Sequence, residues 1–186
     1  ITVSNTAITF ARNNVKTLLI DCDLRKPAIH RIFNLENRLG LTNYLISEIS
    51  GISLKDIIIP SEFENLDIIT CGRIPPNPAE LLSSNSMKEL MKEVKKKYEI
   101  ILLDTPPVGA VTDPSVLATL CDGVIFVIKA ASTPRERIVY SLKLLRRAKV
   151  ETIAAILNQI PVEGGYGYYY YYYYYKYYYG SPDEKK

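Results

Sequence analysis

The feature that most constrains the fold is a set of short runs rich in consecutive apolar residues, without the alternation of polar and apolar residues that a half-exposed strand shows. Such runs are typical of strands buried on both faces, as in a parallel sheet with helices on each side. Stretches with helical character lie between the runs, and this order predicts a doubly wound, mostly parallel α/β fold with right-handed crossovers. The expected strands are residues 15–21, 66–71, 98–104, 123–128 and 152–158. The expected helical stretches are residues 1–13, 40–59, 79–97, 113–121 and 134–149.

The 186 residues divide into a body and a tail. A chain of this length with 47% hydrophobic residues can bury one core of ordinary size. The apolar periodicity ends near "IPVEGG", so we expect a folded domain over residues 1–163 and a disordered tail over residues 164–186. Twelve of the fourteen positions from 166 to 179 are tyrosines: Tyr166, Tyr168, Tyr169, Tyr170, Tyr171, Tyr172, Tyr173, Tyr174, Tyr175, Tyr177, Tyr178 and Tyr179.

Charge and hydropathy exclude several classes of protein. The formal net charge of +3 is too small to indicate a nucleic-acid partner. No run of about 20 apolar residues could span a bilayer, and the first residues lack the charged start and cleavage site of a signal peptide. We therefore expect a cytoplasmic protein that does not bind nucleic acid.

Polar residues end three of the expected strands, and ligands of such folds bind at the carboxyl ends of strands. These residues are Asp21, Asp104 and Asn158. Asp23 follows Asp21 by two positions, so the two carboxylates point the same way if the backbone stays extended. Such a pair repels itself unless a cation or a proton lies nearby. The alternative is that Asp21 caps the following turn while Asp23 is solvated.

Asp104 follows the apolar run "IILL" and precedes "TPP", whose prolines fix the loop. A strand-end aspartate that orders Mg²⁺, directly or through water, has the Walker B role in phosphate-loop enzymes. Together with Asp21 and Asp23 it could place three carboxylates around one site. Such a set of hard oxygen ligands is the environment that Mg²⁺ prefers.

Four segments, taken in order, resemble the bacterial tyrosine kinases that regulate capsular and exopolysaccharide synthesis. They are "LLIDCDLRKP", "GRIPPNPAELLSS", "IILLDTPPVGAVTDPSVLATLCDGVIFVIKA" and the tyrosine-rich tail. "LLIDCD" is similar to the Walker A-prime motif of that family, "ILLDTPP" to its Walker B motif, and the tail to its autophosphorylated tyrosine cluster. The family is related to the deviant-Walker ATPases, so the resemblance implies a P-loop NTPase sheet. It also implies an ATP-dependent protein tyrosine autokinase whose substrate is the tail.

The resemblance assigns a role to each residue that matches a motif. It implies that Asp21 activates the attacking tyrosine hydroxyl and organises the metal, and that Asp23 is a metal ligand or lies next to one. Asp104 would hold Mg²⁺ through water, and Asn158 would read the edge of the adenine ring of ATP. Arg25 could meet phosphate or the acceptor tail, although a surface role is an equal alternative. The implied cofactors are ATP and Mg²⁺.

The phosphate loop GxxxxGK[ST], whose backbone amides cradle the phosphates, does not occur in the sequence. In the family one helix separates that loop from the A-prime strand, and residues 1–13 resemble this helix. We therefore expect a fragment of a longer protein that begins just after the loop. On its own, such a fragment should be inactive and should not bind ATP normally.

The resemblance further implies partners and a location. The expected partners are a membrane adaptor of the polysaccharide co-polymerase type, either fused or separate, further copies of the chain in a ring, and a cognate tyrosine phosphatase. The adaptor would hold the cytoplasmic kinase at the inner face of the plasma membrane.

Two other functions stay open. A switch ATPase of the septum-positioning or plasmid-partition type would share the fold, but it does not explain the tail. The chain could also be a non-catalytic interaction module whose tyrosines act as adhesive groups. Phosphotyrosine formed in the presence of ATP would distinguish a kinase from both.

Overall fold

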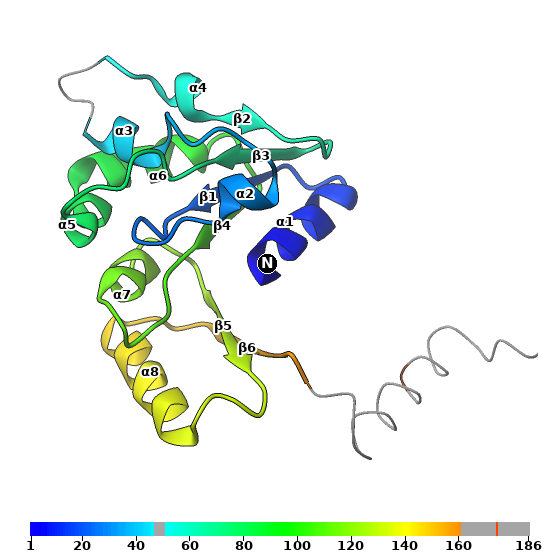
Figure 1. Cartoon of the computed structure of the whole chain (residues 1–186), viewed down its shortest axis with the longest axis vertical. Coiled ribbons are helices and arrows are strands. Elements are labelled where there is room, and N and C mark those ends of the chain that lie inside the picture. Colours follow the sequence, from blue (N-terminus) through cyan, green and yellow to red (C-terminus); the bar gives the residue numbers. More distant parts are fainter. Residues whose placement is uncertain (47–50, 161–173, 175–186) are drawn as a thin grey trace, which may run out of the picture.

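The computed structural model describes residues 1–46, 51–160 and 174, and Figure 1 shows how their elements are arranged. The helices are α1 (Thr2–Arg12), α2 (Ile29–Ile32), α3 (Leu41–Leu45), α4 (Leu54–Ile57), α5 (Pro78–Ser83), α6 (Asn85–Val94), α7 (Asp113–Ala118) and α8 (Arg135–Arg147). The strands are β1 (Thr17–Asp21), β2 (Ile59–Pro60), β3 (Leu66–Ile69), β4 (Ile100–Asp104), β5 (Val124–Lys129) and β6 (Ile153–Asn158). All five strands expected from the apolar runs are present.

A four-stranded sheet with the order β2-β3-β1-β4 lies in the upper half of the molecule in Figure 1. β1 pairs in parallel with β3 on one side and with β4 on the other. The two-residue β2 pairs antiparallel with β3. It contains Pro60, whose missing N–H is tolerated at the edge of a sheet. The mostly parallel α/β fold predicted from the sequence is confirmed, and β2 is a strand that the apolar runs did not indicate.

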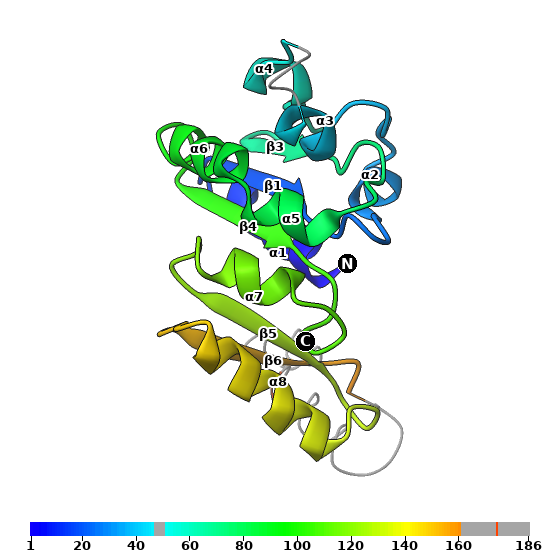
Figure 2. The ribbon, with the colours of Figure 1, turned by 90° about the vertical axis from the view of Figure 1, so that its left-hand side faces the viewer.

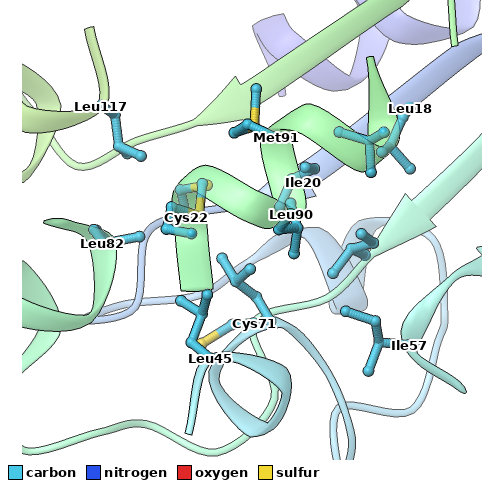
Figure 3. Packing of buried hydrophobic residues seen from close by; sticks show 14 of the residues in the cluster. Leu18, Ile20, Cys22, Leu45, Ile57, Cys71, Leu82, Leu90, Met91 and Leu117 are labelled. Carbon is cyan, nitrogen blue, oxygen red and sulfur yellow. The ribbon is translucent and has the colours of Figure 1, made fainter. Parts of the chain in front are cut away.

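β1 is the most deeply buried strand, and both of its faces are covered. Leu18 and Ile20 point into one apolar cluster, shown in Figure 3, which includes side chains of α6. Leu19 points into a second cluster on the other face, where it meets Ala7 and Ala11 of α1. Because both faces are apolar, the strand shows no alternation of polar and apolar residues.

β5 and β6 form a separate parallel pair, and this corrects the expectation that all five strands are buried on both faces. α8 lies along one face of the pair, and β5 lies on the side nearer to β4 (Figures 1 and 2). Within the described ranges, no strand pairs with the free edge of β5 or with that of β4. Ile125 and Val127 are 47% and 43% exposed, and Leu157 is 55% exposed. Ile125 and Val127 lie on one face of the pair, and Leu157, the register partner of Ile128, lies on the other. Each face therefore leaves apolar side chains partly exposed in the described structure.

The expected helical stretch 79–97 consists of two helices. α5 begins at Pro78, and a proline is well suited to the first helical turn because its N–H would be unpaired there. Ser84 then starts α6, because its Oγ accepts the backbone N–H of Met87 at 3.2 Å. This cap interrupts what the sequence indicated as one helix.

Of the expected tail, the structure describes Tyr174 alone, and its side chain is exposed. The boundary between residues 163 and 164 and the other eleven tyrosines lie outside the described residues. The division into domains and the disorder of the tail therefore stay predictions. None of the helices that the structure describes is long and apolar enough to cross a bilayer.

Candidate functional site

Asp21 is fully buried at the carboxyl end of β1, where its carboxylate holds the loop that follows. One oxygen accepts the N–H of Asp23 at 3.3 Å. The other accepts the N–H groups of Ala28 and Ile29, at 3.1 and 3.0 Å, at the start of α2. Burial raises the pKa of Asp21, and the neighbouring charge of Asp23 adds to that effect, while the three hydrogen bonds act against it. The capping role considered from the sequence is therefore present in the structure.

Asp23 is half-buried and holds the same loop further along. Its Oδ1 accepts the backbone N–H groups of Arg25 at 3.2 Å and of Lys26 at 2.9 Å. The carboxylate is thus anchored rather than freely solvated, although its second oxygen has no hydrogen bond within the described structure.

Asp104 lies directly beside Asp21, because these two residues are register partners at the ends of β4 and β1. The backbone joins them further, since the N–H of Cys22 donates to the carbonyl of Asp104 at 2.9 Å. Burial raises the pKa of Asp104 to about 6, and the charges of Asp21 and Asp23 raise it as well. The sheet therefore brings the three predicted carboxylates to one edge, where they repel one another.

The fit of this edge to Mg²⁺ depends on how the carboxylates are arranged. The residues that the structure describes include no group of three or more His, Cys, Asp or Glu placed to hold a metal ion directly. The three carboxylates therefore do not form a closed cage. Mg²⁺ usually keeps several waters and takes only one or two carboxylates together with substrate phosphates. Repelling carboxylates with raised pKa values suit a cation bound in that way.

Asn158 ends β6 and lies beside the start of α1. Its Nδ2 donates to Oγ1 of Thr2 at 3.1 Å, and its Oδ1 accepts the N–H of Gln159 at 2.8 Å. It lines a shallow pocket with Ile1, Thr2 and polar side chains of α1. These contacts place the end of β6 beside the start of α1. The adenine-reading role of Asn158 stays a prediction.

Arg25 is occupied by a partner that sequence reasoning missed. Its guanidinium makes two hydrogen bonds to the carboxylate of Asp113 at the start of α7, Nε to Oδ2 at 2.8 Å and Nη2 to Oδ1 at 3.1 Å. The Asp113 side chain is fully buried, whereas that of Arg25 is 40% exposed. This pair joins the loop after β1 to the segment after β4, and the contact of Arg25 with phosphate stays a prediction. The signal that could have revealed Asp113 is an acidic residue before a proline, "TDPS", in the segment that follows the Walker B-like strand.

The fold and its strand-end carboxylates define a P-loop NTPase type of α/β protein. In agreement, residues 1–152 match the family model described as "AAA domain". The tyrosine-protein kinase YwqD of Bacillus subtilis (strain 168) is 41% identical over 169 residues, which cover 90% of this chain and 70% of the relative. The putative tyrosine-protein kinase CapB of Staphylococcus aureus is 37% identical over 165 residues, which cover 89% of this chain and 71% of the relative.

Solved structures agree with these relatives. The crystal structure of the chimerical protein CapA2B2 has a TM-score of 0.81 and 33% identity, and the match covers 86% of this chain and 69% of that one. The septum site-determining protein MinD of Pyrococcus horikoshii, complexed with Mg-ADP, has a TM-score of 0.65 at 20% identity over 83% of this chain and 62% of that one, and at this identity it shares the fold alone. The chain belongs to the bacterial tyrosine-protein kinases, a family of protein-tyrosine kinase transferases.

Proposed function

We propose that the chain is the catalytic part of an ATP-dependent tyrosine autokinase that phosphorylates the tyrosines between residues 166 and 179. The observation that carries this proposal is the register pair of Asp21 and Asp104, which sets two carboxylates side by side at the carboxyl edge of a parallel sheet. Phosphoryl transfer depends mainly on positioning and on electrostatic stabilisation. This edge would position the reacting groups, and the cation that its carboxylates would hold would supply the stabilisation.

Asp21 is the group that we assign to the attacking tyrosine. A phenol has a pKa of about 10, so it needs a nearby base or cation to attack at neutral pH. A carboxylate can accept about four hydrogen bonds, and three acceptor positions of Asp21 are used by its own loop. The remaining position would receive the phenolic proton when an entering tyrosine reaches this carboxylate, which is fully buried in the described structure. The three bonds hold the carboxylate in place.

Asp104 and Asp23 are the residues that would hold Mg²⁺, Asp104 through water. The ion, when bound, would neutralise charge on the transferred phosphoryl group. Asp104 remains mostly ionised at neutral pH with a pKa of about 6, so it can order a hydrated cation. The free oxygen of Asp23 faces no competing hydrogen bond in the described structure.

The nucleotide would meet two parts of the whole protein. Asn158 would contact the adenine edge, because an amide both donates and accepts hydrogen bonds. The sequence holds no GxxxxGK[ST] loop, so we propose that a part of the whole protein outside these 186 residues cradles the phosphates. Accordingly, the 186-residue chain alone should bind no appreciable MgATP in calorimetry, and micromolar binding would contradict this division of the site.

The wider role follows from the family. We propose that phosphorylation of the tail regulates the synthesis and export of a capsular or exopolysaccharide. A membrane adaptor of the co-polymerase type, fused or separate, would activate the kinase at the inner face of the membrane. Copies of the chain would form a ring that loosens as phosphate accumulates, and a cognate phosphatase would reverse the modification.

The test is to incubate the whole protein with MgATP and to map phosphotyrosine by mass spectrometry. The autokinase proposal expects several phosphates within residues 166–179. ATP hydrolysis without phosphotyrosine would instead identify a switch ATPase of the septum-positioning or partition type. An absence of both activities would favour a non-catalytic interaction module.

A further inference from the structure

The outer face of α8 carries a surplus of positive charge that the proposed chemistry does not use. The helix contains one carboxylate, Glu136, and five cations that are all exposed: Arg135, Arg137, Lys143, Arg146 and Arg147. In the described part of the chain none of these five cations takes part in an ion pair. We call this surface the α8 basic face.

Helical geometry gathers most of the α8 basic face into one stripe. At about 100° per residue, Arg135, Lys143, Arg146 and Arg147 fall within an arc of roughly 120°. The opposite side of the helix buries Ser141 and Leu145, so the stripe points away from the body. α6 differs, because its lysines are mixed with glutamates and one of them, Lys92, pairs with Glu89 at 2.8 Å. A solvated surface helix usually resembles α6 in this respect.

The helix that carries the α8 basic face lies near the candidate site and near the end of β6. α8 begins six residues after β5 ends, and the N–H of Ala130 donates to the carbonyl of Asn158 at 2.8 Å. Further along the helix, Oγ of Ser141 donates to the carbonyl of Val108, in the loop that follows Asp104, at 3.2 Å. Because β5 and β6 are parallel, the start of α8 lies at the same end of this pair as the end of β6.

We propose that the α8 basic face binds the phosphorylated form of residues 166–179, supplied by the same chain or by a second copy. This rests on the proposed function, because the kinase reaction supplies the phosphates. Each phosphotyrosine carries about −1.5 to −2 charges, so three of them would offset the surplus of the helix. Arginine suits this ligand, since its planar guanidinium binds phosphate through two hydrogen bonds.

Length and side-chain chemistry agree with that occupant. The five residues from 161 to 165 reach at most about 18 Å when extended, and α8, with thirteen residues, is about 20 Å long. The tyrosines can therefore begin beside the first turn of the helix and follow it. Val139, which is 42% exposed and falls within the same arc, can pack against the phenyl rings. Binding would draw a phosphorylated tail away from the site and leave the site open to the next acceptor.

The test uses a synthetic peptide with the sequence of residues 164–180, either unphosphorylated or with phosphotyrosine at three positions, titrated into the 186-residue chain. At about 0.15 M salt, we expect the phosphopeptide to bind at least tenfold more tightly than the unphosphorylated peptide. The triple variant Arg135→Gln, Arg146→Gln, Arg147→Gln should weaken phosphopeptide binding at least tenfold, with an unchanged thermal melt. No preference for phosphotyrosine would overturn the proposal.

A matched control removes the same charge elsewhere. Lys88, Lys96 and Lys97 are exposed on α6 and the turn after it, and the triple change of these lysines to Gln should leave the affinity for the phosphopeptide within about twofold. If both triple variants lost the same affinity for the phosphopeptide, the binding would reflect only nonspecific attraction between opposite charges, and the proposal would be overturned. So would an α8 variant that loses binding to anionic phospholipid vesicles but retains its affinity for the phosphopeptide. Because the phosphates are synthetic, the result does not depend on whether the whole protein transfers phosphate.

Discussion

The pair of Arg25 and Asp113 shows how one contact can fix two parts of the site. Arg25 belongs to the loop that Asp21 and Asp23 hold, and Asp113 begins the helix that follows the loop after Asp104. A buried carboxylate without its partner is costly, because its charge is no longer compensated. The two members of the pair should therefore respond differently to substitution.

Arg25→Met should lower the free energy of unfolding by about 2 kcal/mol, because it leaves the fully buried carboxylate of Asp113 uncompensated. Asp113→Asn should lower it by about 1 kcal/mol or less, since Arg25 is 40% exposed and can turn to water. Urea denaturation of the two variants measures both values. If Asp113→Asn lowered the free energy of unfolding as much as Arg25→Met, or more, the result would contradict the assignment of Asp113 as the buried charge that needs its partner.

Asp104 should make stability depend on pH in a defined window. Its pKa is raised from 3.8 to about 6 on folding, so the folded state binds more protons than the unfolded state between these values. Stability should fall as the pH rises from about 4 to about 6, and the loss should persist above pH 6. In buffer with EDTA, Asp104→Asn should raise the Tm at pH 7.5 because it removes the repulsion between the carboxylates. The rise should be roughly 2–4 °C for each kcal/mol gained in the free energy of unfolding, and no rise should occur at pH 4. A variant with a lower Tm at both pH values would contradict the repulsion inferred at this edge.

At the scale of elements, the segment before α3 crosses the end of β3 at very close range. The N–H groups of Leu41 and Thr42 donate to the carbonyls of Thr70 and Cys71 at 2.8 and 2.9 Å. A Cβ atom on Gly40 would lie 2.3 Å from the carbonyl oxygen of Thr70, so the crossing requires glycine at this position.

Gly40→Ala should therefore lower the free energy of unfolding by about 3 kcal/mol, because backbone must move to admit the methyl group. Gly123→Ala is the matched control, since its added Cβ would meet Thr152 at an ordinary 3.4 Å, and it should cost less than about 1 kcal/mol. Chemical denaturation of both variants provides the comparison. If Gly40→Ala lowered the free energy of unfolding no more than Gly123→Ala, the result would contradict the close approach of Gly40 to the end of β3.

Five of the six described strands could be predicted from the sequence, whereas β2 and the packing of the loops could not. β1 is identifiable because a strand buried on both faces is rich in consecutive apolar residues, as "LLI" at its centre is. The approach of Gly40 to Thr70, and of Arg25 to Asp113, joins residues far apart in the chain. Such contacts depend on how loops pack, and neither residue pattern nor spacing determines that.

At the scale of the whole molecule, the sheet is the main difference from the expectation. The apolar runs predict strands buried on both faces, and β1 meets this, but β5 and β6 form a separate pair with Ile125 and Leu157 about half exposed. Periodicity reports what a strand requires, not which neighbours are present to cover it. The same limit applies to the site, since the sequence placed Asp21 and Asp104 at strand ends but could not give their register.

The tyrosine-rich tail connects the candidate site with the proposed regulation, because it is the proposed substrate. Fourteen extended residues reach up to roughly 45 Å, which would allow the tyrosines to enter the site of a neighbouring copy. Because twelve tyrosines share this segment, no single one should be indispensable. Three phosphates would add roughly −5 charges, which would reverse the formal net charge of +3.

The most direct test of the central claim is the rate of tail phosphorylation in the whole protein carrying Asp21→Asn. With MgATP, and after a thermal melt has established that the variant is folded, we expect phosphotyrosine to form at least about 100-fold more slowly than in the wild type. The control Asp122→Asn, at a carboxylate that is 97% exposed, should retain the wild-type rate. A folded Asp21→Asn protein that phosphorylates its tail within about twofold of the wild-type rate would contradict the role of this carboxylate.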